Sequence, residues 1–210
     1  MPGEPQSSSG KPFFSMIADV KTRQRILNLA GYKAGAVDGI AGPKTQAAQD
    51  KWEAVHKELA AIKTFDSRTE SNLQTLLPQF CAAARAWLAL AIPAAERLGY
   101  TLKVICGTRD YAEQNQLYSK GRTTTGPKVT NVRGGYSFHN FGAAFDIGLF
   151  TASGAYMTSG EPYKKLVSLC PFKHTSVKWG GNFNSFKDYP HFEWYGAGRT
   201  TADLRRKSQP

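Results

Sequence analysis

Residues 137–146 read SFHNFGAAFD, and the interpretation of the whole chain starts from this stretch. Its second half opens an apolar run from Ala143 to Phe150, which is typical of a buried strand and contains Asp146 as its one charged residue. An ionised carboxylate buried in such a run is strongly unfavourable unless a cation lies beside it. A bound metal ion would supply that cation, which makes nearby His139 a candidate ligand.

A second stretch, DYPHFEW at residues 188–194, places His191 at the start of another short apolar strand. Two histidines and one aspartate are the usual donor set of a catalytic zinc site that keeps its fourth position open. The residues alone leave an alternative open, because both histidines could be hydrogen-bonded core residues and Asp146 a cap. We expect the two other histidines to be structural or solvated, with His56 on the surface of a helix and His174 in a loop.

Outward from these stretches, the hydrophobic pattern predicts an α+β domain with a small central sheet flanked by helices. We predict strands at residues 101–106, 143–150, 177–179 and 191–195. We predict helices at residues 73–98, 110–120 and 161–169, with a kink or break in the first at Pro93. The basic run at residues 205–207 is predicted to be a solvated tail.

A small helical unit is predicted at residues 16–62, in front of this domain. Its two clearest helices end near Gly31 and run from Lys44 to Leu59, with a glycine-rich turn between them. Residues 1–15 are predicted to be a flexible leader and residues 63–71 a polar linker. The larger domain then spans residues 72–210.

Composition limits the function classes. The chain has 210 residues and a net charge of +11, from 27 Lys+Arg against 16 Asp+Glu, which favours a polyanionic partner such as nucleic acid or an anionic cell envelope. We expect no nucleic-acid binding, because no zinc finger, helix-turn-helix or aromatic RNA-binding motif is present. The three widely spaced cysteines predict reduced, mostly buried thiols. No apolar stretch is long enough to span a bilayer and no secretory signal is visible, so we expect synthesis in the cytoplasm.

The run GYKAGAVDGIAGPKTQAA, from Gly31 to Ala48, resembles the helical peptidoglycan-binding domain of many wall hydrolases. That family carries the pattern G-Y-x-x-G-x-V-D-G-x-x-G-x-x-T-x-x-A. The resemblance implies a three-helix wall-binding module in which Asp38 braces the loop, Gly39 makes a turn and Thr45 begins the next helix. A generic helical hairpin with a glycine-rich loop is the alternative.

The larger domain resembles the VanY-type zinc peptidases. Its patterns S-x-H-x-x-G-x-A-x-D and D-x-x-H-x-E-W are joined by similar stretches at residues 107–122 and by WGGNF at residues 179–183. Asp110 and Asn182 depart from the family, which usually has Ser and Asp there. The family includes D-Ala-D-Ala carboxypeptidases and the L-alanyl-D-glutamate endopeptidases of phage endolysins, and the likeness implies a Hedgehog/DD-peptidase-like fold.

Carried over by position, the resemblance implies Zn²⁺ bound by His139, Asp146 and His191. Asp188 would be the general base that takes a proton from the attacking water, and Arg109 would face the developing oxyanion. Glu193 is the rival base or the residue that orients His191. The remaining implied residues would bind substrate: Ser137, Gln114, Trp179 and Tyr118.

The resemblance therefore implies a monomeric, phage endolysin-type zinc metallopeptidase. It would cut the peptidoglycan stem peptide, foremost at the L-Ala–D-Glu bond, and reach the wall after a holin opens the membrane of the lysing host. The alternatives are a bacterial D-Ala-D-Ala carboxypeptidase and a non-catalytic wall-binding or phage structural protein.

Overall fold

The computed structural model describes residues 17–184 and 186–210. At its centre is a four-stranded antiparallel sheet with the strand order β1-β2-β4-β3. The strands are β1 (Thr101–Cys106), β2 (Ala144–Phe150), β3 (Val177–Trp179) and β4 (His191–Trp194). Each lies within one residue of its predicted bounds at both ends, so the predicted α+β class with a small antiparallel sheet is confirmed.

The register of the two central strands places two of the proposed metal ligands together. Asp146 on β2 is directly opposite His191 on β4, and Cys106 on β1 is paired with Asp146 on its other side. Residues directly opposite one another on paired strands have Cβ atoms about 4.5–5.5 Å apart and face the same side of the sheet. The pairing therefore brings a carboxylate and an imidazole 45 residues apart in sequence to one point on one face.

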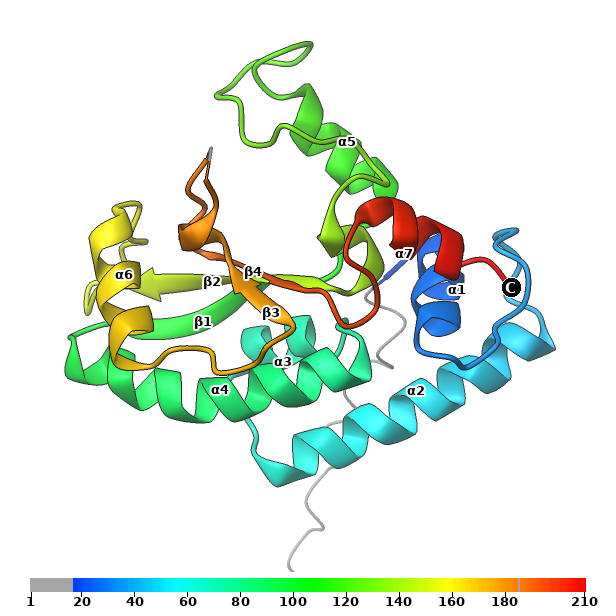
Figure 1. Cartoon of the computed structure of the whole chain (residues 1–210), viewed down its shortest axis with the longest axis horizontal. Helices are drawn as coiled ribbons and strands as arrows, with labels where there is room; N and C mark the ends of the chain where they lie inside the picture. Colours follow the sequence, from blue (N-terminus) through cyan, green and yellow to red (C-terminus); the bar gives the residue numbers. More distant parts are fainter. Residues whose placement is uncertain (1–16, 185) are drawn as a thin grey trace, which may run out of the picture.

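Helices cover the sheet and carry its apolar core. The long helix α4 (Pro78–Arg97) runs along β1, and α6 (Gly160–Leu169) packs against α4 (Figure 1). Between α4 and the sheet, Phe80 stacks on Trp194, and Phe145 stacks on Phe192. This aromatic packing fixes β2 and β4 relative to each other. It therefore also fixes Asp146 and His191, which neighbour Phe145 and Phe192 and face the opposite side of the sheet.

The predicted helix at residues 73–98 divides at a different point from the one expected. Helix α4 continues through Pro93, and the break lies at residues 74–77, between α4 and α3 (Ser67–Leu73). Helix α3 takes up part of the predicted linker, because Asp66 caps it by accepting from the Arg68 and Thr69 backbone amides. The polar sequence there is thus a capped helix that contacts β1.

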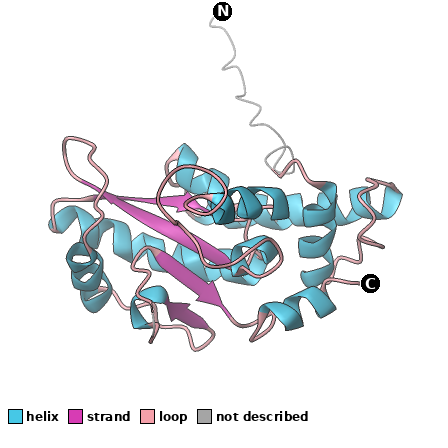
Figure 2. Cartoon of the chain, turned by 90° about the horizontal axis from the view of Figure 1, so that it is seen from above, coloured by secondary structure: helices cyan, strands magenta, loops and turns pink. Residues whose placement is uncertain are grey.

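The N-terminal unit contains two helices among residues 17–62, α1 (Val20–Leu29) and α2 (Pro43–Ile62), where three were expected. A third helix does pack on α1, but it is α7 (Thr201–Lys207) from the other end of the chain, as Figures 1 and 2 show. Asn28 Nδ2 donates to the Ser208 carbonyl oxygen at 3.0 Å across this contact. Residues 205–207 are therefore part of a helix whose Leu204 is fully buried and not a tail, although Arg206 and Lys207 are solvent-exposed as predicted.

The prediction that His56 lies on the surface is also wrong. Its side chain is 3% exposed and stacks on Trp52, with Nε2 at 3.0 Å from the Leu76 carbonyl oxygen. Helix α2 thus packs toward α4 through this face. The predicted leader, residues 1–15, lies outside the described residues, and the domain boundaries stay predictions.

Two further expectations concern the whole chain. Cys81, Cys106 and Cys170 are unpaired, and the first and last are buried, as their spacing predicted. Among the described residues, no helix combines the length and the apolar character that crossing a bilayer requires.

Candidate active site

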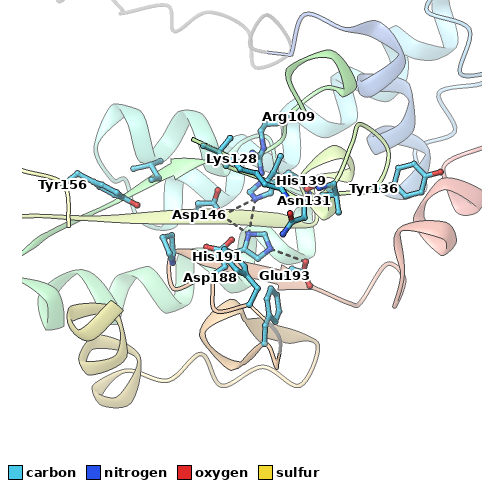
Figure 3. Close-up of a pocket in the computed structure, with 18 residues that line it drawn as sticks. Arg109, Lys128, Asn131, Tyr136, His139, Asp146, Tyr156, Asp188, His191 and Glu193 are labelled. Carbon is cyan, nitrogen blue, oxygen red and sulfur yellow. Dashed lines mark hydrogen bonds and ion pairs between the residues drawn. The ribbon is translucent and has the colours of Figure 1, made fainter. Parts of the chain in front are cut away.

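Three donor atoms converge at the face of the sheet where β2 and β4 meet. His139 Nε2 lies 3.2 Å from Asp146 Oδ1 and 3.2 Å from His191 Nδ1, and His191 Nδ1 lies 2.8 Å from Asp146 Oδ1 (Figure 3). Ligand atoms around a tetrahedral zinc ion, with bonds of about 2.0–2.2 Å, are separated by roughly 3.3 Å. The donor set and its spacing therefore fit one small divalent cation.

The turn that presents His139 follows from its local sequence. The short 3₁₀ helix η2 (Phe138–Phe141) is capped by Ser137, whose Oγ accepts from the His139 backbone amide at 3.3 Å. Gly142 ends it with φ +65°, and a Cβ there would lie 3.0 Å from the Thr75 carbonyl oxygen. A side chain at residue 142 would thus strain both its own backbone and this close approach. In this pattern Ser137 caps the 3₁₀ helix, His139 is the candidate ligand, and Gly142 ends the helix.

The hydrogen bonds of the two imidazoles leave one nitrogen of each facing Asp146. His139 Nδ1 lies 2.7 Å from the Gly107 carbonyl oxygen, so that nitrogen donates and Nε2 points to the aspartate. His191 Nε2 lies 3.2 Å from Glu193 Oε1, which leaves His191 Nδ1 pointing to Asp146 Oδ1. Outer partners of this kind fix the orientation and tautomer of metal-binding histidines.

The electrostatics of the three groups show why the aspartate needs a cation. Burial works to raise the pKa of Asp146, but His139 and His191 together hold that pKa well below its usual range. Burial likewise opposes charge on His191, yet hydrogen bonds to Asp146 and Glu193 raise its pKa to about 10. For His139, burial prevails and lowers the pKa. A metal ion would take the place of the proton held between His191 and Asp146.

Asp188 and Glu193 flank these donors and differ in their hydrogen bonding and in the direction of their pKa shifts. Both line the cavity in front of the three donors, which has a volume of about 640 Å³. Glu193 uses Oε1 for His191 and Oε2 to accept from the Tyr195 hydroxyl at 2.7 Å. The Asp188 carboxylate accepts no hydrogen bond from any described residue, and burial raises its pKa. Hydrogen bonds with His191 and Tyr195 help to lower the pKa of Glu193, so Asp188 is the carboxylate with free oxygens and a raised pKa.

Arg109 lines the same cavity and is held through its backbone. Its amide donates to the His139 carbonyl oxygen at 3.1 Å, and Asn140 Nδ2 donates to the Arg109 carbonyl oxygen at 2.9 Å. Its buried Nε has no hydrogen-bond partner among the described residues. Arg109 therefore lines the cavity with a guanidinium that no described residue binds.

Of the four residues predicted to bind substrate, only Ser137 lines the cavity. Gln114 is fully buried and donates from Nε2 to the Val132 carbonyl oxygen at 2.9 Å. Trp179 donates from Nε1 to the Tyr189 carbonyl oxygen at 2.8 Å, and the Tyr118 ring lies 3.9 Å from the Arg122 guanidinium carbon. These three residues support the loops that form the cavity walls.

The sequence interpretation did not place Cys106 at the site, although strand pairing puts it next to Asp146. Its Sγ lies 3.8 Å from His139 Nδ1, and the Cys106, His139 and Asp146 donor atoms lie within 4.8 Å of one another. The thiol is on the Nδ1 side of His139, which already faces Gly107, and burial raises its pKa to about 12. Cys106 therefore packs behind the imidazole as a neutral thiol.

The residues predicted in the N-terminal unit meet around Gln24, which the sequence did not single out. Asp38 Oδ1 accepts from Gln24 Nε2 and from the Ile40 backbone amide, both at 2.8 Å. The Gly39 amide donates to Gln24 Oε1 at 2.9 Å, with the glycine at φ +89°. Thr45 is buried and lies 3.3 Å from Gln24 Nε2. Gln24, Asp38 and Thr45 border a second cavity of about 400 Å³.

Comparison with known proteins identifies the family. The profile of a peptidase M15 family described as D-alanyl-D-alanine carboxypeptidase matches residues 130–194. The peptidoglycan L-alanyl-D-glutamate endopeptidase CwlK of Bacillus subtilis (strain 168) is 33% identical over 137 residues, which are 61% of this chain and 77% of CwlK. The chain belongs to the M15 peptidase family.

Among solved structures, the Serratia marcescens L-Ala D-Glu endopeptidase ChiX is 24% identical to this M15 peptidase. The likeness covers 62% of this chain and 88% of that one, with a TM-score of 0.42. The family profile spans the segments that contribute His139, Asp146, Asp188 and His191. The protein is thus a metallopeptidase, and its candidate metal ligands lie in the region that the family profile matches.

Proposed function

We propose that this M15 peptidase is a zinc-dependent endopeptidase that hydrolyses the L-Ala–D-Glu bond of the peptidoglycan stem peptide. The convergence of His139 Nε2, Asp146 Oδ1 and His191 Nδ1 within 3.2 Å of one another is the observation that carries the proposal. These three side chains would hold the zinc ion. When bound, zinc supplies Lewis acidity, which polarises the scissile carbonyl and makes water more acidic.

Asp188 is the general base in this proposal. Its carboxylate faces the cavity, accepts no hydrogen bond from a described residue, and has a raised pKa because it is buried. It takes a proton from the attacking water and later passes it to the leaving amine. A positioned acid–base group of this kind contributes about 10²–10⁴-fold to the rate.

Arg109 stabilises the negative charge that develops on the scissile carbonyl oxygen. Its backbone is fixed to His139, its side chain lines the cavity, and its guanidinium makes no hydrogen bond or ion pair with a described residue. Removing one donor from an oxyanion site costs about 10²–10³-fold in turnover. Ser137, which lines the same cavity, is placed to hydrogen-bond the substrate.

The choice of bond rests on the relative CwlK, a peptidoglycan L-alanyl-D-glutamate endopeptidase of which this chain covers 77%. A D-Ala-D-Ala carboxypeptidase is the second candidate, because the matching family profile carries that description. Purified sacculi digested with the enzyme and analysed by mass spectrometry distinguish the two. New peptides with N-terminal D-glutamate are expected, whereas release of free D-alanine would identify the carboxypeptidase.

The proposal extends to the biological role of a phage endolysin, which would be made in the host cytoplasm and reach the wall through a holin lesion. Support comes from the peptidoglycan-binding pattern at residues 31–48 beside the peptidase, and from the net charge of +11, which suits an anionic envelope. The module would hold a monomeric enzyme near its substrate. Adding the protein to cells with a permeabilised outer membrane should lower turbidity, and a chelator should prevent this. Lysis that persists in chelator would contradict a metal-dependent endolysin.

A further inference from the structure

The cavity in front of the three donors is lined by both acidic and basic side chains. Asp188 and Glu193 are acidic and flank the three donor atoms, and Arg109 is joined to His139. One further cation lines this cavity among the described residues, Lys128, which comes from the loop at residues 120–135 that follows α5 (Tyr111–Ser119). Figure 3 shows Lys128 among the labelled residues around Arg109 and His139.

The loop is built to fix the backbone at Lys128. Gly121 has φ +69°, and a Cβ there would lie 2.7 Å from the Lys128 backbone nitrogen, so only glycine permits this approach. Two residues further on, the Thr130 carbonyl oxygen accepts from Arg122 Nη2 at 2.9 Å. Gln114 is fully buried in α5, and its Nε2 donates a hydrogen bond to the Val132 carbonyl oxygen at 2.9 Å. The segment beside the cavity is therefore packed against Gly121 at Lys128 and anchored by hydrogen bonds at Thr130 and Val132.

The ammonium group of Lys128 has no fixed partner in the protein. No hydrogen bond or ion pair joins it to another residue in the described part of the chain. The three structural anchors of the loop belong to Gly121, Arg122 and Gln114, so the lysine side chain is not needed to hold the loop. Lys128 is exposed and lines the cavity, so its charge is available to a ligand there.

The substrate of the proposed reaction carries a negative charge close to the scissile bond. In the stem peptide, D-glutamate is linked onward through its γ-carboxyl group, so its α-carboxylate is free and sits one carbon from the scissile nitrogen. With the scissile carbonyl at Arg109 and the three donors, this carboxylate would enter the same cavity, where Asp188 and Glu193 would repel it. A cation on the cavity wall offsets that repulsion.

We propose that Lys128 is a specificity-determining residue that binds the free α-carboxylate of the D-glutamate on the leaving side of the scissile bond. The inference rests on the proposed function, because it assumes cleavage before D-glutamate. It predicts that the enzyme distinguishes stem peptides with a free α-carboxylate from those in which this group is an amide.

The test uses two synthetic peptides, N-acetyl-L-alanyl-D-glutamate linked onward through its γ-carboxyl and the same peptide with an α-amide. Wild-type enzyme is compared with K128M, K128R and the matched control K120M, which removes an exposed charge from the same loop outside the cavity. K128M should lower kcat/KM for the acid by about 10–100-fold, mainly through KM, and leave the amide unchanged. K128R should recover part of the loss, and K120M should alter neither peptide.

Equal effects of K128M on both peptides, or no effect on either, would overturn the role of Lys128 while the proposed function stands. If wild-type enzyme cleaves neither peptide although it is loaded with zinc, the proposed bond is wrong and the role of Lys128 is overturned with it. Zinc content, measured for each variant, should be the same, because Lys128 touches none of the candidate ligands.

Discussion

His191 Nε2 lies 3.2 Å from Glu193 Oε1, and this contact joins a candidate metal ligand to a carboxylate two residues further along β4. Alternation along a strand puts both side chains on one face of the sheet, where they are neighbours. The other oxygen of Glu193 is taken by the Tyr195 hydroxyl at 2.7 Å. With both oxygens engaged, Glu193 is placed to orient His191 rather than to exchange protons with substrate.

The first prediction concerns Glu193→Gln. The amide can still accept from His191 Nε2, but without the negative charge it supports that donor more weakly, so zinc affinity should fall about 10–100-fold. Turnover at saturating zinc should stay within a few-fold of wild type. Titration with a competing chelator measures the affinity, and rates at excess zinc measure turnover. A large loss of turnover in fully loaded enzyme would instead assign the base role to Glu193.

The second prediction concerns Asp188→Asn, which removes the proposed base and keeps its shape. Zinc content should match wild type, because Asp188 is not one of the three converging donors. Turnover should fall by about 10²–10⁴-fold. Metal analysis and rate measurement on the same preparation separate the two effects. Wild-type turnover in this variant would show that the proton goes elsewhere.

The third prediction concerns His139→Ala, which removes one of three donors and leaves two. We expect loss of both bound zinc and activity, since the remaining donors, Asp146 and His191, cannot complete the usual three-ligand site. Metal analysis after dialysis against zinc-containing buffer gives the occupancy. Full occupancy in the folded variant, checked by circular dichroism, would mean that a ligand is misassigned.

The converging donors were accessible from sequence because each lies in a short local pattern. Ser137 and Gly142 mark the turn that carries His139, and an apolar run with one carboxylate marks β2. The strand bounds followed from the same patterns. What a pattern cannot specify is register, which alone puts Asp146 opposite His191 and Cys106 beside Asp146.

The errors share a different cause, which is packing between distant segments. His56 is followed by Lys57 and Glu58 but is buried, with Nε2 near the Leu76 carbonyl oxygen, and residues 205–207 belong to α7, which contacts α1. Gln114 occupies a family motif position, yet its amide supports a loop. From sequence alone, a motif residue that supports the cavity wall cannot be distinguished from one that contacts substrate.

The fourth prediction concerns Gly180→Ala, in the W-G-G pattern whose purpose the sequence did not reveal. A Cβ at Gly180 would lie 2.3 Å from the Asp188 carbonyl oxygen and 3.1 Å from Asp188 Cβ. The alanine must therefore displace Asp188, and we expect turnover to fall by at least about 10-fold, since misplacement by about 1 Å can cost about 100-fold.

Zinc content of Gly180→Ala should be unchanged, because the donors are untouched. The control is Gly42→Ala, where a Cβ meets nothing within 4 Å and the backbone has φ −80°. Stability measured by urea unfolding accompanies both variants. Normal turnover in Gly180→Ala would show that the position of Asp188 does not matter.

The last prediction concerns the pH dependence of stability through His56, far from the metal donors. Burial lowers the pKa of His56 to about 4, below the value of about 6.5 for the unfolded chain. Between these values the unfolded state binds more protons, so the stabilisation is complete above about pH 6.5 and is lost as pH falls toward 4. The gap in unfolding free energy between wild type and His56→Gln should therefore shrink by about 2–3 kcal/mol from pH 7 to pH 4.5. Urea unfolding of metal-free protein at both pH values removes the contribution of zinc, and a gap that stays constant would mean that His56 titrates normally in the folded protein.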